Sequence, residues 1–324
     1  MNFPQQSLWV LRGRGSVSRA VVDGGQAGIK FKFTRVPVTP GYLIKSDGKE
    51  LIYLKLSVDR LSLVGFKDSY KLDKFLSDIN TDIIDKRVRA NYPFDWRYLL
   101  FGGGVLEIGE LEEQSNIRLD FNPNSVRQAR HREQIERLIS CMKYVKPTRI
   151  DIAIDIKNID LNDYIVIDDM SRKNNRYYSG KNRLETYYLG ARNSDFTIRM
   201  YDKALEQKKD GDWWRIEAQL RREFAENYKN INPFESFVLV EKKSNLDHIK
   251  NFNQKMTVKH LLNEPDDLRL ASDNTRYKYK KILSDLAGSN STQKKLFDFY
   301  DKKKTIVVDT YYNYVKHSFK NDLV

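Results

Sequence analysis

Regular alternation of apolar and polar side chains in four short segments constrains the fold of this chain more than any other feature. The segments read NIRLDFN, TRIDIAIDI, SDFTIRMYDK and DWWRIEAQLR. A repeat of two is the period of a β-strand with one buried face and one polar face. Turns or single helices separate the strands, so the sequence predicts an α+β fold with one mainly antiparallel sheet. We expect helices to cover one face of that sheet.

Apolar residues spaced three and four positions apart predict two helices between the strands. Their apolar stripes are Leu72, Phe75, Leu76, Ile79 and Ile83 in the first, and Ile135, Leu138, Ile139, Met142 and Val145 in the second. A polar linker precedes the third alternating segment, and from about Pro233 the pattern is helical. These patterns predict a β-rich N-terminal arm at 1–50, a main domain at 51–232 and a helical, basic C-terminal region at 233–324.

The charge balance favours a polyanionic partner. The chain has 324 residues, with 57 Lys and Arg against 44 Asp and Glu, which gives a formal net charge of +13. Nucleic acid is the first candidate for such a partner, and an anionic membrane surface is the second. No apolar run approaches the roughly 20 residues that span a bilayer, and the N-terminus lacks the apolar block of a signal peptide. We therefore expect a soluble, cytoplasmic protein.

Cysteine and histidine usage argues against several common kinds of site. Cys141 is the single cysteine, which excludes an internal disulfide and a multi-cysteine zinc site. The four histidines show no zinc-ligand spacing. Histidine therefore gives no support to a metal site.

The stretch from Glu185 to Gln207 predicts a β-hairpin, with a turn through Gly190. Alternation in its second strand places Tyr201 on one face between two cations, Arg199 and Lys203. An exposed aromatic residue among solvated charges would have this pattern. A nucleophilic tyrosine beside cations that hold a phosphate would have it too, and this stretch alone leaves both interpretations open.

The polar faces of the other three strands each carry an arginine followed, two residues later, by an acid. These pairs are Arg118 and Asp120, Arg149 and Asp151, and Arg215 and Glu217. If the strands are neighbours, the pairs gather on one patch with Tyr201. The patch would then be a ladder of cross-strand ion pairs, or an all-oxygen site for Mg²⁺ or Mn²⁺ with arginines that bind DNA. Spacing alone slightly favours the ladder.

A second basic cluster lies in the helical region. Its cations alternate with Tyr277 and Tyr279 and are Arg276, Lys278, Lys280 and Lys281. Alternating aromatic and cationic residues suit stacking on bases together with phosphate contact. The exposed end of an amphipathic helix would look similar, so we weigh the two interpretations equally.

The ordered motifs resemble one family. NIRLDFNPN, TRIDIAIDI, ETYYLG with SDFTIRMYDK, WRIEAQLRRE, and KHLLNEPDD with RYKYKK occur in the order found in the Rep_trans replication initiators. That family includes the initiators of rolling-circle plasmids and related relaxases of integrative conjugative elements. The resemblance covers roughly residues 51–286 and makes 51–232 the nicking domain.

The resemblance implies origin-specific nicking and joining of one DNA strand through a covalent 5′-phosphotyrosine, with Mg²⁺ or Mn²⁺ as cofactor. Matching the motifs residue by residue makes Tyr201 the nucleophile, with Arg199 and Lys203 at the phosphate. The same matching makes Asp120, Asp151 and Glu217 the metal ligands. Asp120 stands where the family has glutamate, which makes it the least secure ligand. Tyr178, Tyr187 and Tyr188 compete with Tyr201 as nucleophile.

The resemblance also implies partners. They are double-stranded origin DNA with an extruded or single-stranded nick site, a host helicase and a second copy of the chain. A conjugative relaxase with the same chemistry is the runner-up function. A non-catalytic origin-binding protein is the alternative from another class, in which the charged ladder is structural and the basic residues hold DNA.

Overall fold

The computed structural model describes residues 41–46, 49–78, 84–100, 102–111, 114–126, 129–170, 172–180, 183–288, 292–316 and 318. All of them belong to one compact unit. Most of the predicted N-terminal arm at 1–50 lies outside the described residues. In its described part, β1 (Tyr42–Ser46) pairs with β2 (Lys49–Lys67), so the chain joins the main sheet before residue 50.

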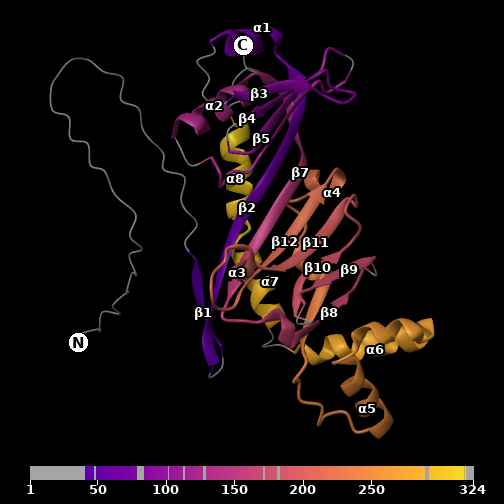
Figure 1. The fold of residues 1–324 in the computed structure, drawn as a ribbon. Coiled ribbons are helices and arrows are strands. Elements are labelled where there is room, and N and C mark those ends of the chain that lie inside the picture. The colour runs from indigo at the N-terminus through magenta and orange to yellow at the C-terminus, as the bar shows by residue number, and fades with distance from the viewer. Residues whose placement is uncertain are drawn as a thin grey trace, which may run out of the picture. The chain divides into compact units, whose positions relative to one another are not determined.

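An antiparallel sheet of eleven strands forms the centre of the described fold (Figure 1). Its order is β3-β4-β5-β6-β2-β7-β12-β11-β10-β9, with β1 paired beside β2. The further strands are β3 (Ile84–Arg89), β4 (Trp96–Leu100), β5 (Gly104–Ile108), β6 (Ile117–Phe121), β7 (Met142–Lys157), β9 (Asn174–Tyr178), β10 (Leu184–Leu189), β11 (Phe196–Asp202) and β12 (Trp213–Arg221). Two more strands, β8 (Tyr164–Asp168) and β13 (Phe237–Glu241), pair antiparallel in a small second sheet.

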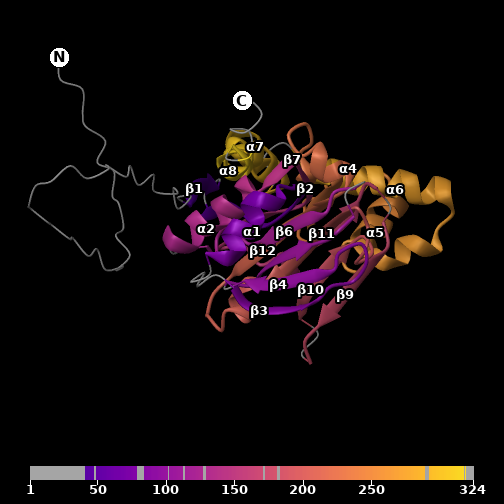
Figure 2. The same ribbon diagram turned by 90° about the horizontal axis from the view of Figure 1, so that it is seen from above.

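Helices complete the described fold. Figure 2 shows them from above, beside the strands of the sheet. They are α1 (Ser69–Ser77), α2 (Ala129–Ser140), α3 (Lys203–Glu206), α4 (Glu223–Glu226), α5 (Phe252–Leu261), α6 (Asp273–Leu286), α7 (Thr292–Lys303) and α8 (Thr305–Val315). Three 3₁₀ helices are η1 (Leu161–Asp163), η2 (Pro233–Ser236) and η3 (Pro265–Leu270). No helix in the described part of the chain is long and apolar enough to cross a membrane.

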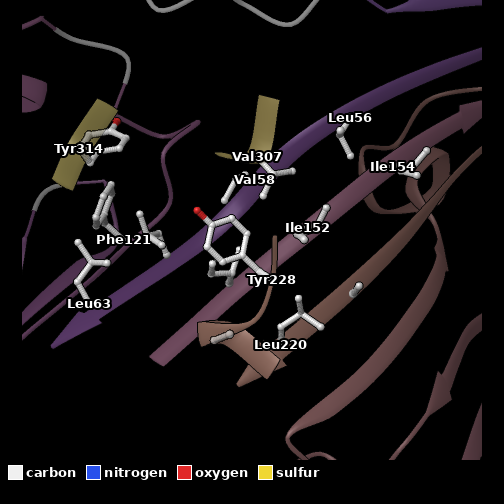
Figure 3. Packing of buried hydrophobic residues seen from close by; sticks show 14 of the residues in the cluster. Leu56, Val58, Leu63, Phe121, Ile152, Ile154, Leu220, Tyr228, Val307 and Tyr314 are labelled. Atoms are coloured by element: carbon white, nitrogen blue, oxygen red, sulfur yellow. The ribbon is translucent and has the colours of Figure 1, made fainter. Parts of the chain in front are cut away.

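The main core lies between the apolar face of the sheet and the helices that cover it (Figure 3). Ile152 and Ile154 of β7 are fully buried there, as the alternation predicts. From α8, the ring of Tyr314 packs against Phe121 of β6 at 4.9 Å between centroids, and Val307 is buried against the same cluster. The predicted fold class, a mainly antiparallel sheet with helices on one face and a C-terminal helical region, is confirmed.

The C-terminal region divides between two hydrophobic clusters. Leu296 and Tyr300 of α7 belong to the main core together with α8. In contrast, Val258 of α5 and Leu283 of α6 pack with β8 and β13 in a second cluster. The helices beyond Pro233 therefore stabilise two different parts of the described unit.

The structure corrects three local predictions. The second predicted helix ends at Ser140, and Met142 and Val145 belong to β7, because pairing of this segment with β2 replaces helical hydrogen bonds. The expected polar linker contains β8 and β9. After the short 3₁₀ helix η2, the predicted helical region continues with a strand, β13, whose run of Val and Leu pairs with β8.

Candidate active site

Cross-strand pairing places the polar faces of β7, β12 and β11 side by side. Tyr201 lies opposite Arg215, which in turn lies opposite Asp155. Arg199 lies opposite Glu217. On the other side of β7 lies β2, and β6 follows after β2. The four alternating segments therefore share one polar sheet face, and three of them are immediate neighbours.

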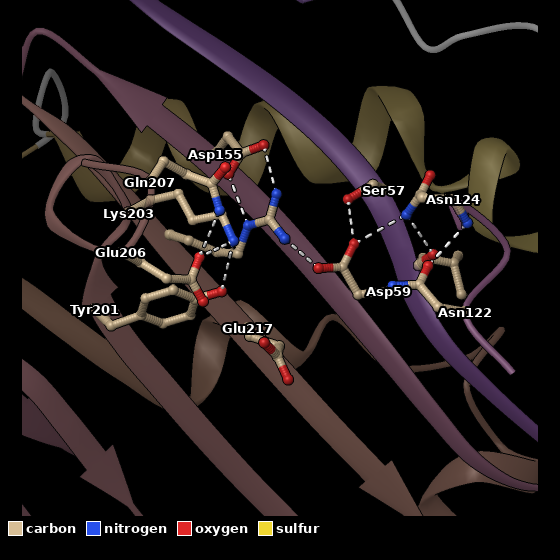
Figure 4. A network of polar contacts seen from close by, with 12 residues as sticks. Ser57, Asp59, Asn122, Asn124, Asp155, Tyr201, Lys203, Glu206, Gln207 and Glu217 are labelled. Atoms are coloured by element: carbon tan, nitrogen blue, oxygen red, sulfur yellow. Dashed lines mark hydrogen bonds and ion pairs between the residues drawn. The ribbon is translucent and has the colours of Figure 1, made fainter. Parts of the chain in front are cut away.

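Tyr201 lies on this polar face and is buried, with 5% of its surface exposed. The Nζ of Lys203 lies 3.4 Å from its hydroxyl oxygen, and the guanidinium of Arg199 lies 4.1 Å from its ring centroid. Lys203 is itself held by an ion pair to Glu206. Although β11 ends at Asp202, the first residue of α3 still reaches the phenol (Figure 4). The predicted arrangement of a tyrosine between two cations is thus present.

The charges around Tyr201 act in opposite directions on its hydroxyl. Burial raises the pKa of Tyr201 above its usual value, Arg215 and Arg199 lower it, and Glu217 and Glu206 raise it. The net pKa is raised, so the phenol is protonated at neutral pH.

A buried ion-pair cluster lies directly beside Tyr201. Arg215 donates from Nε and Nη2 to the two carboxylate oxygens of Asp155 at 2.7 and 2.8 Å, and it also binds Asp59 (Figure 4). Asp59 accepts hydrogen bonds from Ser57 at 2.9 Å and from Asn124 at 3.0 Å. Asp59 and Asp155 are therefore both ion-pair partners of Arg215. Arg215, predicted to bind DNA, is engaged within the protein.

A β-bulge in β2 brings Asp59 to this cluster. The β2–β7 register shifts between Val58 and Arg60, so both Asp59 and Arg60 reach polar-face partners. Asp59 binds Arg215, whereas Arg60 binds Asp120. Simple alternation would assign these two neighbours to opposite faces, which is why the sequence did not single out Arg60.

Asp151 and Glu217 are the acids nearest to one another among the predicted metal ligands. Both oxygens of Asp151 accept from Arg149, at 2.7 and 2.6 Å. The net pKa of Asp151 is raised to about 6, because burial and Glu217 raise it by more than Arg149 lowers it. One oxygen of Glu217 accepts from Gln219 at 2.8 Å, and within the described residues no side chain donates to the other. Glu217 thus keeps a free ligand position.

Asp120 does not join these two carboxylates. It lies on β6, whereas Glu217 lies on β12, three strands away. At the usual spacing between strands, β6 and β12 are about 14 Å apart. Two oxygens on one Mg²⁺ lie within about 4 Å of each other. The carboxylate of Asp120 also accepts from Arg60 at 2.8 Å and from Ser62 at 2.5 Å. The described part of the chain contains no group of three His, Cys, Asp or Glu residues arranged to hold a metal ion.

Half-exposed arginines cover buried carboxylates further along the polar face. Arg97 and Arg118 bind Glu107 at 2.8 and 3.0 Å, and Arg60 binds Asp120. The side chains of these arginines are 37–42% exposed, while those of Glu107 and Asp120 are only 4% and 6% exposed. This face therefore presents positive charge to solvent. Of the three arginines, only Arg118 stood out in the sequence.

The four predicted DNA-binding cations of α6 divide into two pairs. Lys278 and Lys281 are exposed beside Tyr277, which is 73% exposed. Arg276 instead donates to the carbonyl oxygens of Arg269 and Ala271 at 3.1 and 3.0 Å, and Lys280 donates to the carbonyl of Asp168 at 3.1 Å. Lys278 and Lys281 are thus available to a partner, whereas Arg276 and Lys280 contribute to the fold.

The competing tyrosines occupy different environments. Tyr187 is buried in the core on the apolar face. Tyr178 is exposed, and it projects to the face opposite Tyr177 because the two are adjacent in β9. Tyr188 lies on the same face as Tyr201, opposite Arg199. Tyr187 also has a cation at its hydroxyl, Arg176 at 3.5 Å, but none of the three lies beside the ion-pair cluster of Arg215 as Tyr201 does.

Several characterised proteins are similar to this chain over most of its length. One from Staphylococcus aureus, named replication initiation protein, is 27% identical over 250 residues, which cover 72% of this chain and 76% of that protein. A second of the same name and organism is 28% identical over 256 residues, with coverages of 74% and 79%. A third is 26% identical over 267 residues, with coverages of 76% and 82%.

A solved structure of a rolling circle replication initiator protein from Geobacillus stearothermophilus is also similar. It is 20% identical, with a TM-score of 0.36, over 53% of this chain and 76% of that chain. No protein-family profile matches the chain.

Proposed function

We propose that this chain, a relative of the replication initiation proteins, initiates rolling-circle replication of a plasmid by nicking one strand of its origin DNA and later rejoining it. The observation that carries the proposal is the position of Tyr201, with the Nζ of Lys203 3.4 Å from its hydroxyl and Arg199 over its ring. The similarity to replication initiation proteins over about three quarters of the chain supports it.

The chemistry follows from a tyrosine nucleophile. The phenolic oxygen of Tyr201 attacks phosphorus, the bond from phosphorus to the 3′ oxygen breaks, and the 5′ phosphate stays on the tyrosine. The tyrosine loses one proton and the released 3′ oxygen gains one, so neither water nor an external energy source is consumed. Joining is the reverse reaction. Lys203 and Arg199 offset the charge on the phosphate as the phenolate forms and attacks.

A divalent cation, Mg²⁺ or Mn²⁺, is part of this proposal. When bound, such an ion polarises the scissile phosphate. Glu217 fits that role best, because it keeps one oxygen to which no described side chain donates. Asp151 is coupled to it electrostatically and would have to share its two oxygens with Arg149. Asp120 is too distant to share their ion. Its role within this proposal is to hold Arg60 and Arg118 on the polar face.

Supercoiled DNA that carries the matching origin tests the proposal. Wild-type protein with Mg²⁺ or Mn²⁺ should convert it to open circles with protein attached to the 5′ end. Binding without any nick would instead support a non-catalytic origin-binding protein. A relaxase shares the chemistry, and strand transfer of a conjugative origin would identify it.

Glu217→Gln should lower the nicking rate by at least about 100-fold while duplex binding stays intact. The reason is that this carboxylate takes part in the cleavage step and does not attract the DNA phosphates. Chelation of the metal by EDTA should stop nicking by the wild type. Asp120→Asn is the matched control, since it also removes one buried acid from the polar face. It should lower stability but leave nicking measurable in the folded protein. Equal loss of nicking in both variants would contradict these assignments.

Replacing Lys278 and Lys281 together with alanine should weaken binding to duplex origin DNA. The slope of log affinity against log salt concentration should become less steep by the amount that about two phosphate contacts contribute. The melting temperature of the protein should be unchanged. Arg276→Ala should instead lower the free energy of unfolding by about 1–3 kcal/mol, because it removes donors to three carbonyl oxygens. An unchanged salt dependence in the double lysine variant would exclude α6 from DNA binding.

A further inference from the structure

Three tyrosines form a group on the polar face of β9, β10 and β11. Tyr177 and Tyr201 both lie opposite Thr186, one on each side of β10. Tyr188 lies opposite Arg199 on the same face. The rings of Tyr177 and Tyr188 meet edge to face, with 5.9 Å between centroids and an angle of 80° between planes.

Arg199 connects this pair to the nucleophile. Its guanidinium lies 5.8 Å from the ring centroid of Tyr188 and 4.1 Å from that of Tyr201. Its Nε is buried and has no hydrogen-bond partner among the described residues. A continuous surface of two aromatic rings and one cation therefore leads away from Tyr201 toward β9, the last strand on this side of the described sheet.

Tyr177 is exposed at a position where packing does not require an aromatic residue. It is 55% exposed, whereas Tyr187, on the opposite face of the same pair of strands, is 2% exposed. Exposed aromatic rings beside cations are the arrangement by which proteins hold single-stranded nucleic acid, because every base has a face that can stack. Duplex bases are already stacked on each other, so an exposed aromatic ring favours the unstacked bases of a single strand.

We propose that Tyr177 and Tyr188 form a stacking platform for bases of single-stranded DNA next to the scissile phosphate. The inference rests on the proposed function of Tyr201 and identifies the DNA form that this part of the sheet binds. Tyr177 is two strands from Tyr201, which is about 10 Å. Arg199 lies between the platform and the nucleophile, where it can contact the backbone.

Tyr177→Ala, Tyr188→Ala and Tyr188→Phe test the platform, with Tyr178→Ala as the matched control. Tyr178 is 53% exposed and adjacent in sequence, but it lies on the other face of β9. The probe is a fluorescent oligothymidylate of about 20 nucleotides, followed by anisotropy without metal. Tyr177→Ala and Tyr188→Ala should each weaken binding about tenfold. Tyr188→Phe and Tyr178→Ala should leave binding within about twofold of wild type.

An abasic oligomer of the same length separates stacking from charge. It keeps the phosphates and lacks the bases, so Tyr177→Ala should bind it as well as wild type does, and the salt dependence should be unchanged. Equal weakening by Tyr178→Ala, or the same loss on the abasic oligomer, would overturn the platform. If Tyr177→Ala weakens oligothymidylate binding but wild type forms no covalent adduct with origin DNA, the proposed function fails and the platform stands.

Discussion

Tyr201→Phe is expected to abolish formation of the covalent protein–DNA adduct and to lower nicking by at least about a thousandfold. The variant removes only the hydroxyl oxygen, which is the attacking atom in the proposed function. Its ring keeps the contact with Arg199, and the sole side-chain donor near the lost hydroxyl is Lys203 at 3.4 Å among the described residues. Folding and origin binding should therefore be close to those of wild type, as circular dichroism and gel-shift measurements can establish.

Tyr188→Phe provides the control on the same hairpin. Tyr188 shares the face of Tyr201 but has no part in bond formation, so its variant should nick at close to the wild-type rate. A Tyr201→Phe protein that still forms the adduct would exclude Tyr201 as nucleophile. Loss of nicking in both variants would point to a disturbed hairpin.

Arg215→Met should lower the free energy of unfolding by about 3–5 kcal/mol, the cost of leaving buried acids without a counter-ion. The side chains of Asp155 and Asp59 are 4% and 16% exposed, and Arg215 binds both. Urea unfolding measures the loss. Further replacement of both aspartates with asparagine should recover part of it, because the unpaired charges are then absent.

Arg137→Met is the matched control for that measurement. Arg137 also pairs with an aspartate, Asp78, but the two side chains are 46% and 50% exposed. An exposed ion pair contributes at most about 1 kcal/mol. If both arginine variants lose the same small amount, the cluster beside Tyr201 does not stabilise the fold.

Alternation along the strands allowed much of the fold and part of the site to be predicted. It placed Ile152 and Ile154 in the core and put Tyr201 between Arg199 and Lys203, because the period of a strand decides which side chains share a face. The ordered motifs predicted a resemblance to replication initiators, and the relatives named replication initiation protein confirm it. The assignment of Tyr201 as nucleophile stays a prediction.

The spatial order of the strands could not be read from the sequence. Insertion of β2 between β6 and β7 moves Asp120 away from Glu217, although each follows an arginine at the same spacing. The bulge at Asp59 depends on pairing between β2 and β7, and no local residue preference predicts it. Likewise, pairing with β2 ends the predicted helix early and assigns Met142 to a strand. These features arise from long-range contacts, which local patterns do not contain.

Peptide mapping of the covalent adduct tests the identity of the nucleophile most directly. Wild-type protein is incubated with origin DNA and Mg²⁺, then digested with nuclease and trypsin before mass spectrometry. Cleavage after Arg199 and Lys203 gives the peptide MYDK, which contains Tyr201 alone. Tyr187 and Tyr188 lie together on LETYYLGAR, and Tyr177 and Tyr178 on YYSGK. The proposed function predicts a nucleotide phosphate on MYDK, and a phosphate on either other peptide would contradict it.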